Sequence, residues 1–226
     1  MTRTPISVTD PNVRPVAIET LLAGEVKQLL AAGQRARAAE RFGEIIDRQQ
    51  RRAARIAYHY LRDPADVDEV VQDAFLKAFL HLPSFREDLF FELWFTRILV
   101  NACLNRLKSR NRRTRWLVQQ EPHEGMADTG PASPQPSPET RLLAKERRTQ
   151  LEAAVDRLPT RQRTAVILTH FEGRTTREAS LVMGLNESTV RVHLFRAVRK
   201  LRGSLNRDEW LGRTPFDRDD RSRRRA

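Results

Sequence analysis

Residues 119–140 read QQEPHEGMADTGPASPQPSPET and divide the chain. The stretch contains five prolines, and its few apolar residues follow no helical or strand period. It carries four acidic residues and no Lys or Arg, so we do not expect it to bind nucleic acid. This composition is typical of a flexible, partly polyproline-like linker. The chain is therefore expected to hold two small domains, one on each side.

Charge and length limit the function of the two domains. The chain has 226 residues, with 41 Lys or Arg against 29 acidic residues, and its net charge is +12. Only five of the basic residues are lysines, and the planar guanidinium of arginine suits phosphates and guanine. The excess of basic residues indicates a polyanionic partner. Nucleic acid is the first candidate, and an anionic membrane is the second.

Several classes of protein are excluded by what the sequence lacks. The single cysteine, Cys103, cannot form an intramolecular disulfide, and no run reaches the ~18 apolar residues of a membrane span. The first ten residues lack the apolar core of a signal peptide. The histidines have no metal-ligand spacing, and phosphate loops and nucleophile elbows are missing. We expect a cytoplasmic protein without metal, cofactor, catalytic residues or membrane insertion.

The block before the linker has the apolar period of α-helices. One stripe covers residues 42–60, and Asp63-Pro64 interrupts it, so Pro64 is expected to begin the next helix. A second stripe covers 67–82, a loop covers 83–88, and a third helix is predicted over about 89–110.

The block after the linker is helical as well. Helices are predicted over about 151–158, from Thr160 as a capping residue, over 176–183 and over 187–201. A weaker helix is expected at about 16–32, and the tail 206–226 is expected to be disordered. No strand pattern of useful length is present. The predicted fold class is all-α.

Charges of opposite sign fall on different segments. Residues 62–92 contain eight acids and three bases, whereas residues 94–116 contain seven bases and no acid. Residues 188–202 contain five bases and no acid. The two basic segments predict nucleic-acid binding, and the acidic segment, which cannot face phosphates, is the natural site for a protein partner.

Residues 176–196 have the pattern of a helix-turn-helix. Ala179 and Ser180 allow close helix packing, and Gly184 falls where the turn needs a left-handed residue. The second helix buries one stripe, from Val190 to Leu201, and can place its other face in a major groove. That free face holds Thr189, Arg191, His193, Arg196 and Arg199.

The third helix of the first block combines an aromatic residue with base-reading side chains. Trp94, Arg97, Asn101 and Asn105 share one helical face, where they can stack on unpaired bases and bind base edges. The adjacent aromatic residues are expected to wall a pocket for an extruded base. These are Phe85, Phe90 and Phe91.

These motifs, in this order, resemble the bacterial sigma factors of RNA polymerase, in their extracytoplasmic function class. Residues 66–75, DVDEVVQDAF, resemble region 2.2, and residues 94–101, WFTRILVN, resemble regions 2.3 and 2.4. The stretch from Leu158-Pro159 to Arg196-Ala197 resembles region 4. The chain departs from the family at Val67-Asp68-Glu69, where Ala-Glu-Asp is usual. It also departs at Phe95 and Ala179-Ser180, and these two departures affect packing more than chemistry.

The resemblance implies a sigma region 2 helical bundle and a sigma region 4 helix-turn-helix domain, joined by the linker. It implies binding to the β′ clamp helices and β subunit of core RNA polymerase, to promoter DNA and to an anti-sigma factor, sometimes at the inner membrane. The expected divisions are an N-terminal extension (1–38), region 2 (39–115), the linker (116–141), region 4 (142–205) and the tail (206–226).

The resemblance also implies three sets of site residues. Polymerase binding falls on Asp66, Asp68, Glu69, Gln72, Asp73 and Phe75. Recognition of the −10 element falls on Phe85, Arg86, Trp94, Arg97, Asn101, Asn105, Lys108 and Arg110. Recognition of the −35 element falls on Ser188, Thr189, Arg191, His193, Arg196 and Arg199.

Two other functions fit parts of the pattern. A helix-turn-helix regulator with an N-terminal effector domain would bind duplex DNA without polymerase, but it leaves the basic, aromatic third helix without a role. An RNA-binding or ribosome-associated helical protein would need no acidic partner surface. An enzyme is the weakest alternative, because the sequence offers no catalytic constellation.

Overall fold

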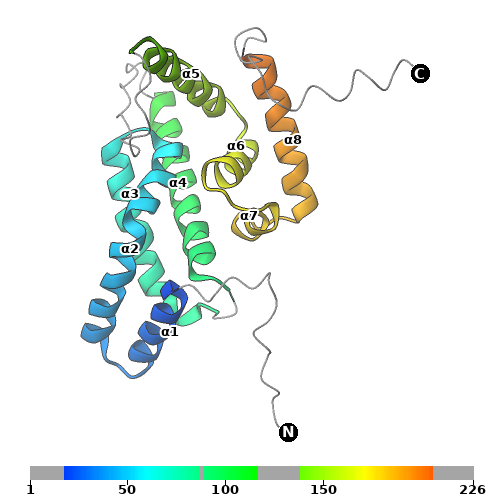
Figure 1. The fold of residues 1–226 in the computed structure, drawn as a ribbon. Coiled ribbons are helices and arrows are strands. Elements are labelled where there is room, and N and C mark those ends of the chain that lie inside the picture. The colour runs from blue at the N-terminus through cyan, green and yellow to red at the C-terminus, as the bar shows by residue number, and fades with distance from the viewer. Residues whose placement is uncertain (1–17, 87–88, 117–137, 206–226) are drawn as a thin grey trace. The chain divides into compact units, whose positions relative to one another are not determined.

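The computed structural model describes residues 18–86, 89–116 and 138–205, and the chain divides into two compact units, Met1–Met126 and Ala127–Ala226. Within these residues every regular element is helical, which confirms the all-α prediction (Figure 1). The first unit contains α1 (Ile18–Ala31), α2 (Arg35–Leu61), α3 (Pro64–His81), a 3₁₀ turn η1 (Leu82–Ser84) and α4 (Phe91–Trp116). The second contains α5 (Pro138–Asp156), α6 (Thr160–Val166), a π-helical turn η2 (Ile167–Phe171), α7 (Thr176–Met183) and α8 (Glu187–Ser204).

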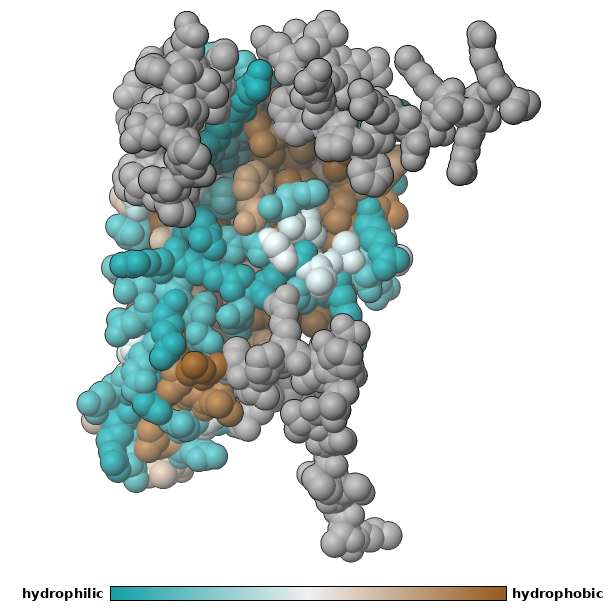
Figure 2. Space-filling model, in the orientation of Figure 1, coloured by the Kyte–Doolittle hydropathy of each residue, from teal (hydrophilic) through white to brown (hydrophobic). Residues whose placement is uncertain are grey.

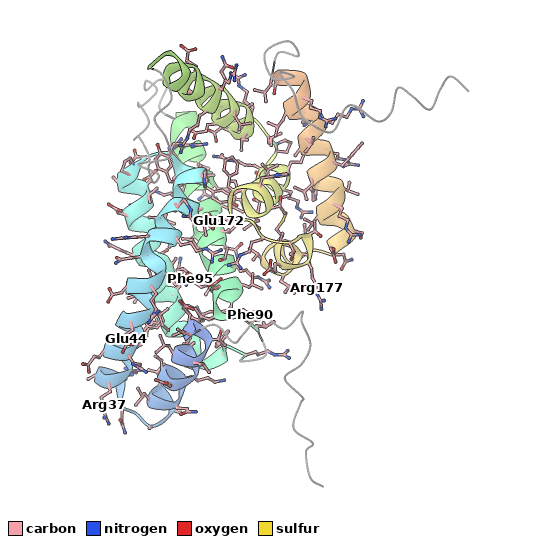
Figure 3. The ribbon with its side chains drawn as sticks, in the orientation of Figure 1. Arg37, Glu44, Phe90, Phe95, Glu172 and Arg177 are labelled. Carbon is pink, nitrogen blue, oxygen red and sulfur yellow. The ribbon has the colours of Figure 1, made fainter. Side chains whose placement is uncertain are left out.

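Aromatic side chains fill much of the core of the first unit. Phe75 of α3 stacks on Phe95 of α4 with ring centroids 4.5 Å apart, and Phe42 of α2 lies 5.3 Å from Phe79. Phe95 therefore lies between helices, as Figure 3 shows. The outward face of α2 is charged, with exposed Arg48 among others, and Figure 2 shows this hydrophilic surface.

Helix α1 belongs to the core of the first unit. Leu22, Ala23 and Val26 are buried in it, and Glu25 accepts a hydrogen bond of 2.7 Å from Arg41 of α2. The sequence prediction placed residues 1–38 outside this domain. That boundary is wrong for α1, because a short apolar stripe gives a weak periodic signal even when part of it is buried.

The junction of α2 and α3 follows from three consecutive residues. Arg62 ends α2 in the left-handed conformation, with φ of 62°. Asp63 is extended, as a residue before proline must be, and its carboxylate accepts from the N–H groups of Ala65 and Asp66 at 2.9 and 3.2 Å. Pro64 begins α3, as predicted.

The second unit packs α5, α6 and α8 around a small core of Val155, Leu158, Val166 and Ala197. Thr160 was predicted to cap α6 with its side chain, and this is wrong. Pro159 occupies the capping position, and Thr160 is the first helical residue.

Two boundaries differ from the prediction. Helix α4 continues to Trp116 rather than ending near residue 110, and α5 begins at Pro138, inside the stretch predicted as linker. The rest of the predicted linker, over 117–137, and the predicted disordered tail, 206–226, lie outside the described residues. In the parts of the chain that the structure covers, no helix is long and apolar enough to cross a membrane.

Candidate functional site

The outward face of α4 is polar and basic. Arg97, Asn101, Asn105 and Lys108 are all exposed, and their spacing of four, four and three residues places them along one side of the helix. Arg112 continues the row. No acidic residue occurs in residues 94–116, so nothing on this face repels a phosphate. We call these five residues the α4 row.

Trp94 lies half-buried at the start of the α4 row, over an aromatic cluster. Its ring is 5.1 Å from Phe85 and 5.7 Å from Phe91 between centroids. Phe85 and Phe91 are only 1% and 0% exposed. They were expected to wall a pocket for an extruded base, and this expectation is corrected: they form the floor that supports Trp94. Phe90, labelled in Figure 3, is half-buried just before α4.

Helix α1 holds both ends of the loop between η1 and α4, a role that the sequence did not reveal. Lys27 donates a hydrogen bond of 2.9 Å to the carbonyl of Phe85, and Thr20 accepts one of 3.0 Å from the N–H of Phe91. Both contacts join positions more than 50 residues apart, which no local pattern predicts. Arg86 is exposed at the end of the described part of the loop.

The outward face of α3 combines acidic and apolar side chains. Asp68, Glu69 and Gln72 are exposed, and Leu76 and Leu80 continue the same side at 59% and 65% exposed. The leucines were not among the predicted site residues, although Leu76 lies four residues after Gln72 and Leu80 four residues after Leu76, a spacing that places all three on one side of the helix. We call these five residues the α3 face.

Two predicted members of the polymerase set have other positions. Phe75 is 6% exposed and packs in the core against Phe42 and Phe95, so it cannot contact a partner directly. Asp73 is half-buried and pairs with Lys77 at 2.6 Å, one helical turn away.

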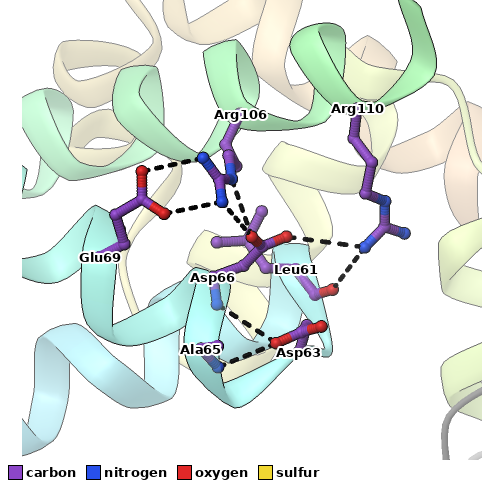
Figure 4. A network of polar contacts seen from close by, with 7 residues as sticks. All are labelled: Leu61, Asp63, Ala65, Asp66, Glu69, Arg106 and Arg110. Carbon is purple, nitrogen blue, oxygen red and sulfur yellow. Dashed lines mark hydrogen bonds and ion pairs between the residues drawn. The ribbon is translucent and has the colours of Figure 1, made fainter. Parts of the chain in front are cut away.

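Arg106 of α4 ties together two of the acidic residues of α3 (Figure 4). It donates to Asp66 at 2.5 and 2.8 Å and contacts Glu69 at 2.7 and 2.9 Å. The hydrogen bond to Asp66 and then the nearby charges raise the pKa of Arg106. Because the Asp66 side chain is only 14% exposed, it serves this internal bridge rather than a partner, which corrects its predicted role.

Arg110 also departs from its predicted role. Its guanidinium lies 3.9 Å from the Asp66 carboxylate and donates to the carbonyl of Leu61 at 3.4 Å. Figure 4 shows it turned toward the α2–α3 junction. It therefore does not join the α4 row, from which it is displaced around the helix.

The helix-turn-helix is confirmed in detail. Thr175 and Glu178 form a reciprocal capping box at the start of α7, with hydrogen bonds of 3.1 and 2.9 Å. Gly184 ends α7 with φ of 63°, the left-handed conformation predicted for it. Thr176 then donates to Glu187 at 2.7 Å, which joins α7 to the first turn of α8.

On α8 the predicted DNA-reading residues separate into two groups. Ser188, Arg191, Arg196 and Arg199 are exposed, and Arg191 pairs with Glu187 at 2.6 Å. The pKa of Glu187 is lowered first by the hydrogen bond that it accepts from Thr176 and then by its pairing with Arg191. Thr189 is half-buried.

The predicted role of His193 is corrected, because both its ring nitrogens are buried and have no hydrogen-bond partner among the described residues. Burial, and then the charges of Arg161 and Arg196, lower its pKa. The ring faces the protein rather than a base edge. Val192 and Phe195 are instead exposed on the outward side of α8, and neither was among the predicted site residues.

Comparison with known proteins assigns both units. The family model for sigma-70 region 2 matches residues 45–113, and the model for sigma-70 region 4 matches residues 148–201. The ECF RNA polymerase sigma-E factor of Escherichia coli (strain K12) is 32% identical over 157 residues, which cover 69% of this chain and 82% of that protein. The RNA polymerase sigma-H factor of Pseudomonas aeruginosa is 31% identical, with 69% and 81% covered.

Solved structures share the fold. CnrH, in complex with the cytosolic domain of CnrY, is 24% identical with a TM-score of 0.56, and the match covers 84% of this chain and 98% of CnrH. The sigma factor RpoE of Bartonella quintana, in complex with the anti-sigma factor NepR, is 20% identical with a TM-score of 0.55, covering 73% and 96%. Because both sigma regions match in order, and relatives above 30% identity are covered over most of their length, the chain belongs to the sigma-70 family of RNA polymerase sigma factors, in its extracytoplasmic function (ECF) class.

Proposed function

We propose that this sigma factor binds core RNA polymerase through the α3 face, opens and reads the −10 element with the α4 row, and reads the −35 element with α8. One observation carries the proposal: the first unit separates its chemistry between two helices. The α3 face is acidic and apolar, and the α4 row is polar and basic. A phosphate backbone is attracted only to the α4 row, whereas the α3 face suits a protein partner.

On the polymerase side, Asp68 and Gln72 would meet the β′ clamp helices, and the β subunit would complete the interface. Leu76 and Leu80 expose large apolar areas, and a partner that covers them gains the free energy of removing that surface from water. A charged rim around exposed leucines is the usual composition of a protein interface. Glu69 contributes after its bridge to Arg106 has fixed its position.

On the −10 side, the α4 row would hold the strand that separates as the duplex opens. Arg97 and Lys108 supply positive charge for phosphates, and Asn101 and Asn105 offer amide donors and acceptors for the edges of unpaired bases. Trp94 provides a ring on which a base can stack. Unstacking costs a few kcal/mol, and capture of the freed base offsets this cost.

On the −35 side, α8 would lie in the major groove as the recognition helix. Ser188 and Arg191 stand near its N-terminus, where base edges are reached, and Arg196 and Arg199 stand further along, where phosphates lie. The chain itself would carry out no bond chemistry, because the polymerase supplies it.

We also propose regulation by an anti-sigma factor in the cytoplasm, or at the inner membrane if that factor is anchored there. Two proteins of the same fold were solved bound to another protein: CnrH to the cytosolic domain of CnrY, and the sigma factor RpoE to the anti-sigma factor NepR. The α3 face and α8 offer exposed apolar residues that a protein of this kind would cover.

Gel filtration with bacterial core polymerase, followed by transcription from a promoter library, tests the proposal. We expect the purified chain to co-elute with the polymerase and to yield transcripts from promoters that share −35 and −10 sequences. A folded chain that binds duplex DNA tightly but never co-elutes would support the helix-turn-helix regulator instead.

A further inference from the structure

Helix α1 packs against α2, η1 and α4, and it lies outside residues 45–113, the part of the chain that the region 2 family model matches. Two of its polar side chains, Thr20 and Lys27, are seven residues apart, which places them on one side of the helix, two turns from each other. Thr20 is 6% exposed and Lys27 is half-buried. Both side chains therefore lie on the side of α1 that the rest of the unit covers.

Thr20 caps α4 from another helix. The first N–H groups of an α-helix have no partner within the helix, and a polar side chain just before the helix commonly accepts from one of them. Phe90, which precedes α4, has no acceptor in its side chain. The N–H of Phe91 instead donates to the hydroxyl of Thr20 over 3.0 Å, and this hydrogen bond is buried. Thr20 therefore fixes the backbone at the start of α4.

Lys27 holds the other end of the loop between η1 and α4. Its ammonium donates to the carbonyl of Phe85 over 2.9 Å, in a partly buried position. A hydrogen bond from a charged donor is stronger than one between neutral groups. One side of α1 therefore holds the backbone of both Phe85 and Phe91.

The two residues held in this way support the ring of Trp94. The rings of Phe85 and Phe91 are buried, lie edge to face 5.8 Å apart, and are 5.1 and 5.7 Å from Trp94. A close-packed floor of this kind transmits a shift of its backbone to the ring above it. The position of Trp94 therefore depends on Thr20 and Lys27, although neither is needed to bind DNA.

We propose that Thr20 and Lys27 are positioning residues for the opening of the −10 element. They keep the ring of Trp94 in place before DNA arrives, so an unstacked base meets a surface that is already ordered. A surface that must be ordered during binding loses affinity, and one that is held in advance avoids this loss. The inference rests on the proposed function, in which Trp94 stacks on a base of the opened strand.

The fluorescence of Trp94 tests the positioning without DNA. Trp116 and Trp210 are first replaced by phenylalanine, which leaves Trp94 as the single tryptophan of the full chain. In this background Thr20→Val removes the acceptor at almost constant size, and Lys27→Met removes the donor and keeps the apolar stem. We expect acrylamide to quench Trp94 more strongly in both variants. Thr20→Ser, which keeps the hydroxyl, should be quenched like the parent chain.

Promoter opening tests the effect on function, with the full chain, core polymerase and a promoter selected from the library. Thr20→Val and Lys27→Met should co-elute with polymerase like the unmodified chain, because the α3 face is unchanged. Permanganate reactivity of the −10 thymines should show that the equilibrium constant for opening falls about fivefold, the effect of one lost hydrogen bond. Thr20→Ser should open the promoter normally.

Glu25→Gln is the matched control. Glu25 also lies on α1, but its side chain is exposed and pairs with Arg41 of α2 at 2.7 Å. Its replacement should change neither the quenching of Trp94 nor promoter opening. Circular dichroism checks the fold of every variant. If Thr20→Val, which alters a buried side chain, does not fold, then the half-buried Lys27→Met decides the test.

The other outcomes separate this inference from the proposed function. Unchanged quenching in Thr20→Val and Lys27→Met would overturn the inference, and so would a loss of opening in Thr20→Ser as large as in Thr20→Val. Loss of co-elution together with opening would show that α1 only supports the fold of the unit. Normal opening by Trp94→Ala would contradict the proposed function itself. Impaired opening by Trp94→Ala, with normal opening by both α1 variants, would contradict the positioning role alone.

Discussion

Arg106 shows how a single side chain determines which acidic residues of α3 remain available. It satisfies Asp66 and Glu69 at once, on the side of α4 that faces α3, opposite to the α4 row. Asp68, one residue from Glu69, has no share in this bridge and stays exposed. Two acidic residues of one motif therefore differ in position: Asp66 serves an internal bridge, and Asp68 is exposed and available for the interface that we propose.

Arg106→Gln should destabilise the first unit by about 1 kcal/mol, because it leaves the half-buried Asp66 carboxylate without its strongest partner. Urea unfolding, followed by circular dichroism and tryptophan fluorescence, measures the loss. Arg112→Gln, on the same helix but exposed, serves as the control and should change nothing. Equal stability of the two variants would show that the bridge contributes nothing measurable.

We expect His193 to make the second unit sensitive to acid. Because burial lowers its pKa in the folded state, the unfolded chain binds the proton more readily, and stability therefore falls as pH drops below the unfolded value of about 6.5. Melting of the second unit should shift to lower temperature between about pH 7.5 and pH 5.5. His193→Gln should reduce this shift relative to the unmodified chain, and an unchanged pH dependence would assign the sensitivity to other groups.

At the scale of elements, helix type and position followed from the apolar period, while boundaries and roles did not. The stripes of α2, α3, α7 and α8, and the left-handed Gly184, were predicted, because each depends on residues within one or two turns. The packing of α1 and its hydrogen bonds to the loop before α4 were not, since they join distant segments. The same limit explains why Phe75, Phe85 and His193 were placed on the surface: periodicity does not say which neighbour covers a side chain.

The Asp63 cap tests the local logic of the α2–α3 junction. Asp63→Ala should cost about 1 kcal/mol of stability, because two N–H groups at the start of α3 lose their acceptor. Asp63→Asn, which keeps an acceptor oxygen, should retain most of it. Denaturant unfolding of both variants decides the matter, and a cost as large for Asn as for Ala would contradict the capping role.

For the whole molecule, the net charge is +12, and the way in which the charges are distributed over the helices matters more than this total. Basic residues gather on the α4 row and on α8, in different units, and the exposed acidic residues of the first unit include Asp68 and Glu69 on another helix, α3. In the function that we propose, each promoter element binds its own basic helix, and the polymerase binds an acidic surface that does not attract DNA. The central claim is that these surfaces have separable functions.

The most direct test compares Asp68→Lys with Asn101→Ala in two assays, co-elution with core polymerase and transcription from a selected promoter. Asp68→Lys should lower polymerase affinity about tenfold or more, because it reverses a charge at the interface. Asn101→Ala should co-elute like the unmodified chain yet lose open-complex formation, and Glu40→Lys, an exposed reversal on α2, should pass both assays. If Asp68→Lys binds polymerase normally, or if Asn101→Ala fails to bind it, then the assignment of α3 to polymerase and α4 to DNA is wrong.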